Sequence, residues 1–253
     1  MEQFERTEWI FGKAGMAKLF AAKIAVFGIG GVGGYAVEAL ARSGVGRLDL
    51  FDHDRISLSN LNRQIHTTRN NIGQYKVDAA RTRIGEINPE AIVATYPLFL
   101  TPETSSQVAF AAYDYIIDAI DTVAGKIELA VQAKVWGVPI ISAMGAGNKI
   151  EASCLEVADI YETSVCPLAR VMRHELRKRG IKQLKVVYSK EAALSPKRDG
   201  PGADTAESAS PQGTPGGSFL RRQIPGSNAF VPAVAGLIIA GEVVKDLTAD
   251  CIG

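Results

Sequence analysis

The sequence predicts an α/β protein in which a mostly parallel sheet carries helices on both faces. Three observations support this fold class. Short apolar runs rich in β-branched residues alternate with longer segments of helical periodicity. A glycine-rich turn joins the first of these strands to the helix that follows it. The 253 residues include 47% hydrophobic and 22% charged side chains, a globular composition that argues against a fibrous or disordered chain.

Strand and helix patterns alternate along the chain from the amino terminus. Residues 5–20 have helical periodicity interrupted by Gly12 and Gly15, and residues 23–29 form an apolar, β-branched run typical of a buried strand. Residues 31–44 space their apolar side chains as a helix does and end in glycine. The same patterns predict strands at 47–52, 92–97, 113–120, 138–145 and 184–192, and helices at 73–88, 122–137, 166–180 and 230–247. Right-handed crossovers would bring the carboxyl ends of the strands to one edge, where ligands bind.

The pattern changes near residue 150, although the length fits a single domain, 1–253. We therefore divide the chain into a core, 1–150, and an extension, 151–253. Within the extension, residues 195–217 are rich in Pro, Gly, Ser, Ala and Thr and have no hydrophobic period. Such a composition cannot bury a core, so a mobile loop is expected there.

Composition also bears on location and partners. The three cysteines form no Cys-x-x-Cys pair, which argues against a disulfide framework or a zinc ribbon and favours reduced thiols. The amino terminus lacks the apolar segment of a secretory signal, so a cytoplasmic location is expected. The longest apolar stretch, 229–241, is shorter than the roughly 18–20 residues of a membrane span. A buried core helix is expected there, with peripheral contact to a membrane surface as the alternative. A net charge of +1 argues against a uniformly basic nucleic-acid coat protein.

The glycine-rich turn, Gly28-Ile29-Gly30-Gly31-Val32-Gly33, fits the G-x-G-x-x-G pattern of a Rossmann-like nucleotide site. Glycines let the backbone approach phosphate oxygens, and the helix amino terminus adds unpaired N–H donors. Asp52 ends the next strand, 19 residues after Gly33, where an acid can bind ribose hydroxyls. The motif indicates a nucleotide. It does not distinguish a nicotinamide or flavin cofactor from ATP, and a tight turn without a ligand is a further alternative.

The polar stretch after Asp52 favours a triphosphate. Arg63 offers a planar fork of donors to phosphate oxygens, and nearby asparagines can bridge ribose and phosphate. Lys76 lies in the first turn of the helix predicted at 73–88, where its charge opposes the helix dipole, and this suggests a phosphate partner. The alternative is a solvated surface lysine. Asp118 and Asp121 close another strand, where carboxylates can hold Mg²⁺ or cap the next helix. We expect Asp118 to be structural.

Four segments carry a family resemblance: GIGGVGG, LFDHDRISLSNLNRQ, GQYKVDAA and DAID. Over residues 5–145 they resemble the ATP-binding core of the ubiquitin-activating-type adenylyltransferase superfamily. The resemblance implies attack of a carboxylate on the α-phosphate of ATP, and pairing of two chains as a homodimer. It implies catalytic roles for Arg6, Arg63, Lys76 and Asp121, with Asp121 on Mg²⁺ and Arg6 acting in the partner subunit's site. The implied ATP-binding set is Gly28, Gly30, Gly31, Gly33, Asp52, Ser59, Asn60, Asn62, Arg63, Gln64, Lys76 and Asp121.

The extension narrows the resemblance to one branch. Relatives that adenylate sulfur carriers usually hold zinc in two Cys-x-x-Cys pairs, which this sequence lacks. Residues 142–153, 158–181, 186–192 and 230–247 are similar to tRNA threonylcarbamoyladenosine dehydratases. This implies an enzyme using ATP and Mg²⁺ without zinc, with an ATP-binding core and a tRNA-binding extension. The alternative is an adenylyltransferase for a ubiquitin-like sulfur-carrier protein. A monovalent cation, a sulfur-relay partner and the role of the cysteines stay open.

A basic segment independently favours an RNA partner. Between Arg170 and Arg198, ten Lys or Arg stand against two Glu. Such a patch attracts a phosphate backbone, and the alternative is a solvated helix face. The RNA-binding residues predicted on this ground are Arg170, Arg173, Arg177, Lys178, Arg179 and Lys182.

Overall fold

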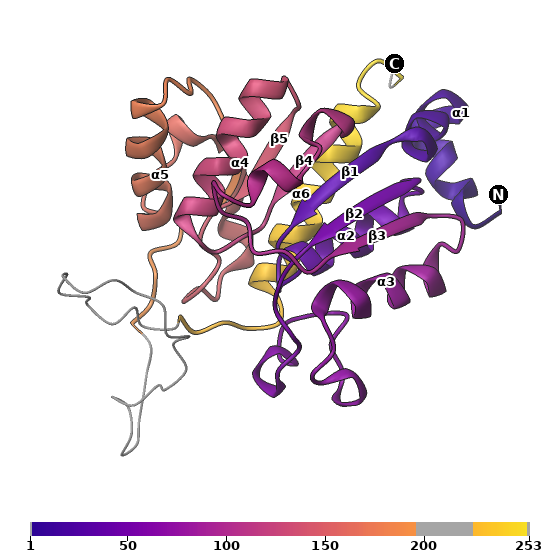
Figure 1. The fold of residues 1–253 in the computed structure, drawn as a ribbon, viewed down its shortest axis with the longest axis horizontal. Coiled ribbons are helices and arrows are strands. Elements are labelled where there is room, and N and C mark those ends of the chain that lie inside the picture. Colours follow the sequence, from indigo (N-terminus) through magenta and orange to yellow (C-terminus); the bar gives the residue numbers. More distant parts are fainter. Residues whose placement is uncertain (1, 196–224, 252–253) are drawn as a thin grey trace.

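The computed structural model describes residues 2–195 and 225–251 and contains a seven-stranded sheet in the order β3-β2-β1-β4-β5-β7-β6 (Figure 1). Every neighbouring pair is parallel except β6 and β7. The strands are β1 (Lys23–Phe27), β2 (Arg47–Phe51), β3 (Ile92–Tyr96), β4 (Tyr115–Asp118), β5 (Ile140–Ala143), β6 (Leu155–Asp159) and β7 (Lys185–Ser189). The longer helices are α1 (Glu5–Ala21), α2 (Gly33–Arg42), α3 (Lys76–Ile87), α4 (Val123–Trp136), α5 (Pro167–Lys178) and α6 (Val231–Leu247).

Helices cover both faces of the sheet, because the side chains of each strand alternate between two buried layers. On β1, Ile24 and Val26 pack in the layer that includes residues of α1, α2, α3 and α6. Ala25 and Phe27 point the other way, into the layer covered by α4. Helix α5 joins this second side through Ala169, Met172 and Leu176. The predicted Rossmann-like α/β class is therefore confirmed.

Helix α6 packs one apolar face against α2, as predicted for a core helix, while Leu237 on its other side is 47% exposed. A Cβ added at Gly236 would lie 2.2 Å from the carbonyl oxygen of Val32, so the two backbones approach as closely as glycine allows. Ile239, Val243 and Val244 complete the buried face of α6. In the described part of the chain, no helix combines the length and the apolar character needed to cross a membrane.

Three details differ from the sequence prediction. Gly12 interrupts α1 with a φ of 69°, as expected, whereas Gly15 stays helical. Strand β6 was not predicted, because this edge strand is only half-buried and carries Glu156 and Asp159 in place of a clear apolar alternation. Of the expected mobile loop, 195–217, all but Ser195 falls outside the described residues.

Candidate nucleotide-binding site

The glycine turn follows β1 and leads into α2. Gly28 has a φ of 88°, and a Cβ there would lie 2.5 Å from the carbonyl oxygen of Ala119. A Cβ at Gly33 would lie 1.8 Å from the carbonyl oxygen of Gly28. A Cβ at Gly30, by contrast, would meet no atom within 4 Å. The fold itself therefore requires Gly28 and Gly33, whereas Gly30 leaves open space where a phosphate could approach the backbone.

We predict that Gly30→Ala weakens ATP binding by at least about tenfold, because the new methyl group would occupy the space beside the phosphate-binding backbone. The free energy of unfolding should stay nearly unchanged, since a Cβ at Gly30 would have no atom within 4 Å apart from those of its chain neighbours. Calorimetric titration with ATP and urea denaturation measure the two quantities. Gly85→Ala on α3 is the matched control, because a Cβ there also meets no atom within 4 Å. Equal ATP affinity in the two variants would contradict the placement of phosphate at this turn.

Asp52 ties the end of β2 to the glycine turn. Its Oδ2 accepts a hydrogen bond from the backbone N–H of Ile29 at 2.7 Å, and its Oδ1 accepts one from the N–H of Asp54 at 2.8 Å. Burial raises the pKa of Asp52, and the nearby Lys76 ammonium partly offsets that rise. Each carboxylate oxygen keeps a second lone pair. Asp52 can therefore position the turn and still accept a ribose hydroxyl.

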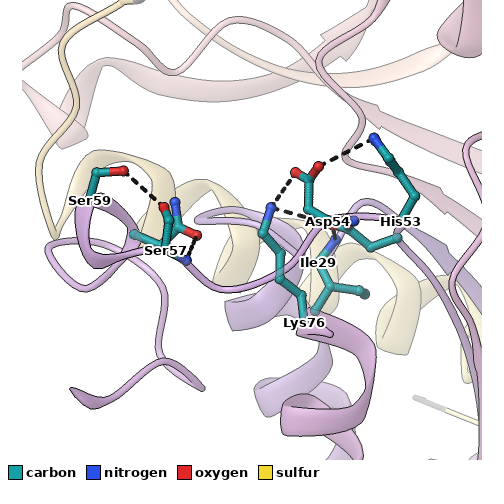
Figure 2. A network of polar contacts seen from close by, with 8 residues as sticks. Ile29, His53, Asp54, Ser57, Ser59 and Lys76 are labelled. Carbon is teal, nitrogen blue, oxygen red and sulfur yellow. Dashed lines mark hydrogen bonds and ion pairs between the residues drawn. The ribbon is translucent and has the colours of Figure 1, made fainter. Parts of the chain in front are cut away.

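Lys76 is a buried lysine at the first position of α3, and its ammonium group reaches the carboxylates of Asp52 and Asp54 (Figure 2). Its Nζ lies 2.6 Å from Oδ2 of Asp54 and 3.9 Å from Oδ2 of Asp52. These acids explain how a lysine is tolerated at a helix amino terminus, where its charge opposes the dipole. The lysine is not a solvated surface residue, and its ammonium stands beside the predicted ribose acid.

A cluster of three potential metal ligands lies next to Lys76. Asp52, His53 and Asp54 can each offer a ligand atom, and these atoms lie within 4.8 Å of one another. His53 Nε2 is 3.3 Å from Oδ1 of Asp54. Asp121, the predicted Mg²⁺ ligand, belongs to no such group among the described residues and is exposed in the connection between β4 and α4.

The segment from Ser57 to Gln64 forms a compact loop stabilised by its own side chains. Oδ1 of the buried Asn60 accepts a hydrogen bond from the Ser57 N–H at 3.0 Å, and the Oγ atoms of Ser57 and Ser59 are 3.0 Å apart (Figure 2). The Gln64 side chain is buried, and its Oε1 has no partner among the described residues. Asn60 therefore orders the loop, whatever it also contacts.

Arg63 lies half-buried along the glycine turn. Its Nη1 donates to the carbonyl oxygen of Ser59 at 2.8 Å and to Oδ1 of Asn62 at 3.0 Å. A Cβ added at Gly31 would lie 3.4 Å from Cγ of Arg63, so the arginine stem passes directly beside the turn. The structure thus brings together the turn, Asp52, Lys76 and the loop that carries Arg63.

Two buried polar groups near the site were not singled out from the sequence. Lys126 Nζ lies 3.0 Å from Oδ2 of Asp118 and 3.2 Å from Oγ of Ser142, and Asp118 also accepts the N–H of Ile120. This agrees with the expected structural role of Asp118. The sequence did hold a signal for the burial of Lys126, because this lysine falls on the same apolar face of α4 as Leu129, Ala130 and Ala133.

His66 is the second buried group. Neither ring nitrogen has a partner among the described residues, and Nδ1 would lie 3.0 Å from a Cβ at Gly34 in α2. Burial lowers the pKa of His66 to about 4, with Lys76 and Arg83 adding to the effect. The imidazole is therefore neutral at physiological pH.

Arg6 is exposed on α1 and does not reach the site of its own chain. Helix α1 leads into the amino end of β1, whereas the glycine turn follows the carboxyl end of that strand (Figure 1). The rings of Phe4 and Phe20, near the two ends of the kinked helix, pack at a centroid distance of 5.6 Å. This contact holds Arg6 near the amino end of the sheet, away from the glycine turn of its own chain.

The pattern of glycines, acids and basic residues on this sheet edge agrees with a match to a known family. The model of the ThiF family matches residues 5–251. The chain belongs to the ThiF family. It is 42% identical over 254 residues to the tRNA threonylcarbamoyladenosine dehydratase of Bacillus subtilis (strain 168), and the match covers 99% of this chain and 96% of that protein.

Solved structures agree with this ThiF-family assignment. The Escherichia coli tRNA N6-threonylcarbamoyladenosine dehydratase in complex with ATP has a TM-score of 0.83 and 31% sequence identity, and the match covers 98% of this chain and 95% of that one. The complex of the same enzyme with AMP has a TM-score of 0.84. A shorter match, 34% identical over 59% of this chain, joins it to a Saccharomyces cerevisiae adenylyltransferase and sulfurtransferase, of which it covers 34%.

The basic segment of this ThiF-family chain is less uniformly charged than its sequence suggests. Glu175 pairs with Lys178 and Arg179, each at 2.8 Å, and Arg177 lies over the Tyr161 ring at 5.0 Å. Acids from distant elements pair with Lys185 and Lys190, and Arg173 donates to Thr163. Arg170 and Lys182 are exposed. Two further cations of the basic segment, Lys197 and Arg198, fall outside the described residues.

Proposed function

We propose that this chain is an ATP-dependent tRNA threonylcarbamoyladenosine dehydratase that activates a carboxylate by adenylation and then closes a ring. The observation that carries the proposal is the 42% identity to the Bacillus subtilis enzyme of that name along nearly the whole of both chains. The high TM-scores to an enzyme solved with ATP and with AMP support it further. The local geometry agrees, because the glycine turn, Lys76 and Arg63 converge on one edge of the sheet.

The proposed chemistry has two steps. A carboxylate oxygen of the modified adenosine attacks the α-phosphorus of ATP, and pyrophosphate leaves. A nitrogen of the same side chain then attacks the activated carbonyl and loses its proton, and AMP departs with the carboxylate oxygen. The first step needs no general base, because the carboxylate is already ionised at neutral pH. The tethered nucleophile of the second step gains a high effective concentration.

The protein's part in this chemistry is positioning and charge stabilisation. Backbone N–H groups of the glycine turn would cradle phosphates, and Lys76 and Arg63 would balance the negative charge that develops on the phosphate oxygens. The exposed carboxylate of Asp121, in the connection after β4, is the kind of oxygen ligand that Mg²⁺ prefers. When bound there, Mg²⁺ would neutralise the pyrophosphate leaving group.

The decisive assay incubates the protein with ATP, Mg²⁺ and tRNA that carries threonylcarbamoyladenosine. The nucleoside should lose the mass of one water, about 18 Da, and AMP and pyrophosphate should form in equal amounts. Omission of Mg²⁺ should stop the reaction. An unchanged nucleoside mass, together with ATP–pyrophosphate exchange that depends on a carrier protein ending in Gly-Gly, would refute the proposal and support the sulfur-carrier alternative.

We further propose a homodimer in which Arg6 acts in the partner subunit's site. Arg6→Ala and Arg63→Ala should each retain about 1% of wild-type activity or less alone, yet a mixture after subunit exchange should regain about a quarter of wild-type activity. This follows because half of the dimers are mixed, and each mixed dimer has one site with both arginines intact. If the mixture stays inactive although exchange is complete, Arg6 does not act across the interface.

The exposed cations of α5 and the turn after it are proposed to contact the tRNA backbone. Arg170→Ala combined with Lys182→Ala should weaken tRNA binding, and the slope of log affinity against log salt should fall by roughly 1 for each phosphate group that the variant no longer neutralises. ATP affinity should not change. Arg81→Ala on α3, an exposed arginine paired with Asp78, is the control. A salt dependence identical to wild type would exclude these residues from the RNA interface.

A further inference from the structure

Residues 225–228, a short segment before α6, contact two loops of the candidate site. One loop follows β5 and carries Asn148, and the other follows β2 and carries Asn62. Asn148, which follows β5, has a φ of 57°. Its N–H donates to the carbonyl oxygen of Gly226 at 2.8 Å, and its Oδ1 accepts the N–H of Gly226. Asn148 therefore grips this segment with both its backbone and its side chain.

Further contacts fix the segment on both sides of Ser227. A Cβ at Gly147 would lie 2.8 Å from Cβ of Pro225, so the segment sits as close to the β5 loop as glycine permits. Asn228 donates to the carbonyl oxygen of Lys149, and its Oδ1 accepts the N–H of Val231 at 2.9 Å, at the start of α6. The carbonyl group of Ser227 is thus held between two anchored residues.

Asn62 connects this carbonyl to Arg63. Its Nδ2 donates to the Ser227 oxygen at 3.0 Å, and its Oδ1 accepts from Arg63 Nη1 at 3.0 Å. Both ends of the Asn62 amide are occupied by protein groups, which favours a linking role over direct contact with ATP. An uninterrupted series of contacts therefore runs from Asn148 through Gly226, Ser227 and Asn62 to the guanidinium.

We infer that Asn148 is a positioning residue for Arg63 and acts through Ser227 and Asn62. The inference rests on the proposed function in one respect, namely that Arg63 contacts ATP. A guanidinium held by a fixed acceptor keeps its orientation without losing rotamer freedom on binding, and a fixed donor stabilises phosphate charge better than a mobile one. The left-handed backbone of Asn148 suits this position, because asparagine, aspartate and glycine tolerate that conformation best.

Two substitutions separate the side-chain contact from the backbone. Asn148→Gly keeps the left-handed conformation but removes the acceptor for the Gly226 N–H, and should lower ATP affinity and turnover by roughly fivefold to tenfold. Asn148→Asp keeps both the acceptor and the backbone preference and should stay within about twofold of wild type. Equal losses in the two variants would overturn the inference.

A double-mutant cycle tests the route to Arg63. In an Arg63→Ala background, Asn148→Gly should change ATP affinity by less than about twofold, because the group it positions is gone. An undiminished effect in that background would assign Asn148 a purely structural role and overturn the inference. ATP affinity, measured by calorimetry, tests the role of Asn148 independently of the tRNA reaction. If the wild-type protein binds ATP but leaves the tRNA nucleoside unchanged, only the proposed function is refuted. A wild-type protein that fails to bind ATP overturns both.

Discussion

Arg63→Ala and Lys76→Ala should each slow turnover by roughly 10²–10³-fold, the usual cost of removing one preorganised donor from a developing charge. Each cation lies beside a different wall of the proposed site. Arg63 runs along the glycine turn at Gly31, and Lys76 stands over the carboxylates of Asp52 and Asp54. The fold should survive because Arg63 is only half-buried. Of the two acids that Lys76 leaves behind, Asp54 is half exposed, and the buried Asp52 keeps the N–H groups of Ile29 and Asp54 as hydrogen-bond donors. Steady-state kinetics and urea denaturation measure the two effects.

The matched controls for this prediction are Arg69→Ala, an exposed arginine shortly after Arg63, and Arg81→Ala, an exposed residue of the same helix as Lys76. Both should retain wild-type turnover. Near-normal rates in the Arg63 and Lys76 variants would defeat the assignment of the site. Rates that fall only in proportion to a loss of folded protein would do the same.

Lys126→Met should lower the free energy of unfolding by about 3–5 kcal/mol, because it leaves the carboxylate of Asp118 buried without its counter-charge. Both side chains of this ion pair are 1% exposed, and the Asp118 carboxylate holds the connection after β4 through the N–H of Ile120. Ser142→Ala removes one neutral partner and should cost only about 1 kcal/mol. Denaturation midpoints and slopes in urea give these values.

The double variant Lys126→Met with Asp118→Asn is the sharper test of the same ion pair. The amide is neutral and keeps an oxygen for the Ile120 N–H, so most of the loss should be recovered. Two results would contradict the prediction that Lys126→Met leaves a buried, uncompensated charge on Asp118. One is a loss of less than about 1 kcal/mol in the single variant, and the other is a double variant no more stable than the single one.

The elements with strong periodicity were predictable from the sequence, and long-range polar pairing was not. β1 and the glycine turn are local signals, since a β-branched run and fixed glycine spacing leave few alternatives. Edge strand β6 was missed, because its half-buried surface weakens the alternation on which the prediction depends. The basic segment appeared more strongly charged than it is, because Glu156, Glu242 and Asp246 lie far away in sequence.

The candidate site shows the same division. Lys76 and Asp52 could be placed on one sheet edge from strand and helix signals alone. Asp54 is the acid that explains the position of Lys76, but no local sequence pattern distinguishes it from the acids around it. Asn62 donates to Ser227 across 165 residues, and only the folded chain can reveal such a contact.

Helix α6 packs directly on Val32, inside the glycine turn, and Pro232 lies against Gly31. The two parts come from opposite ends of the described chain, so a ribosome completes the first long before the second has left the exit tunnel. A half-made protein therefore lacks the support behind its nucleotide turn. The proposed ATP site is thus assembled only after α6 has been translated.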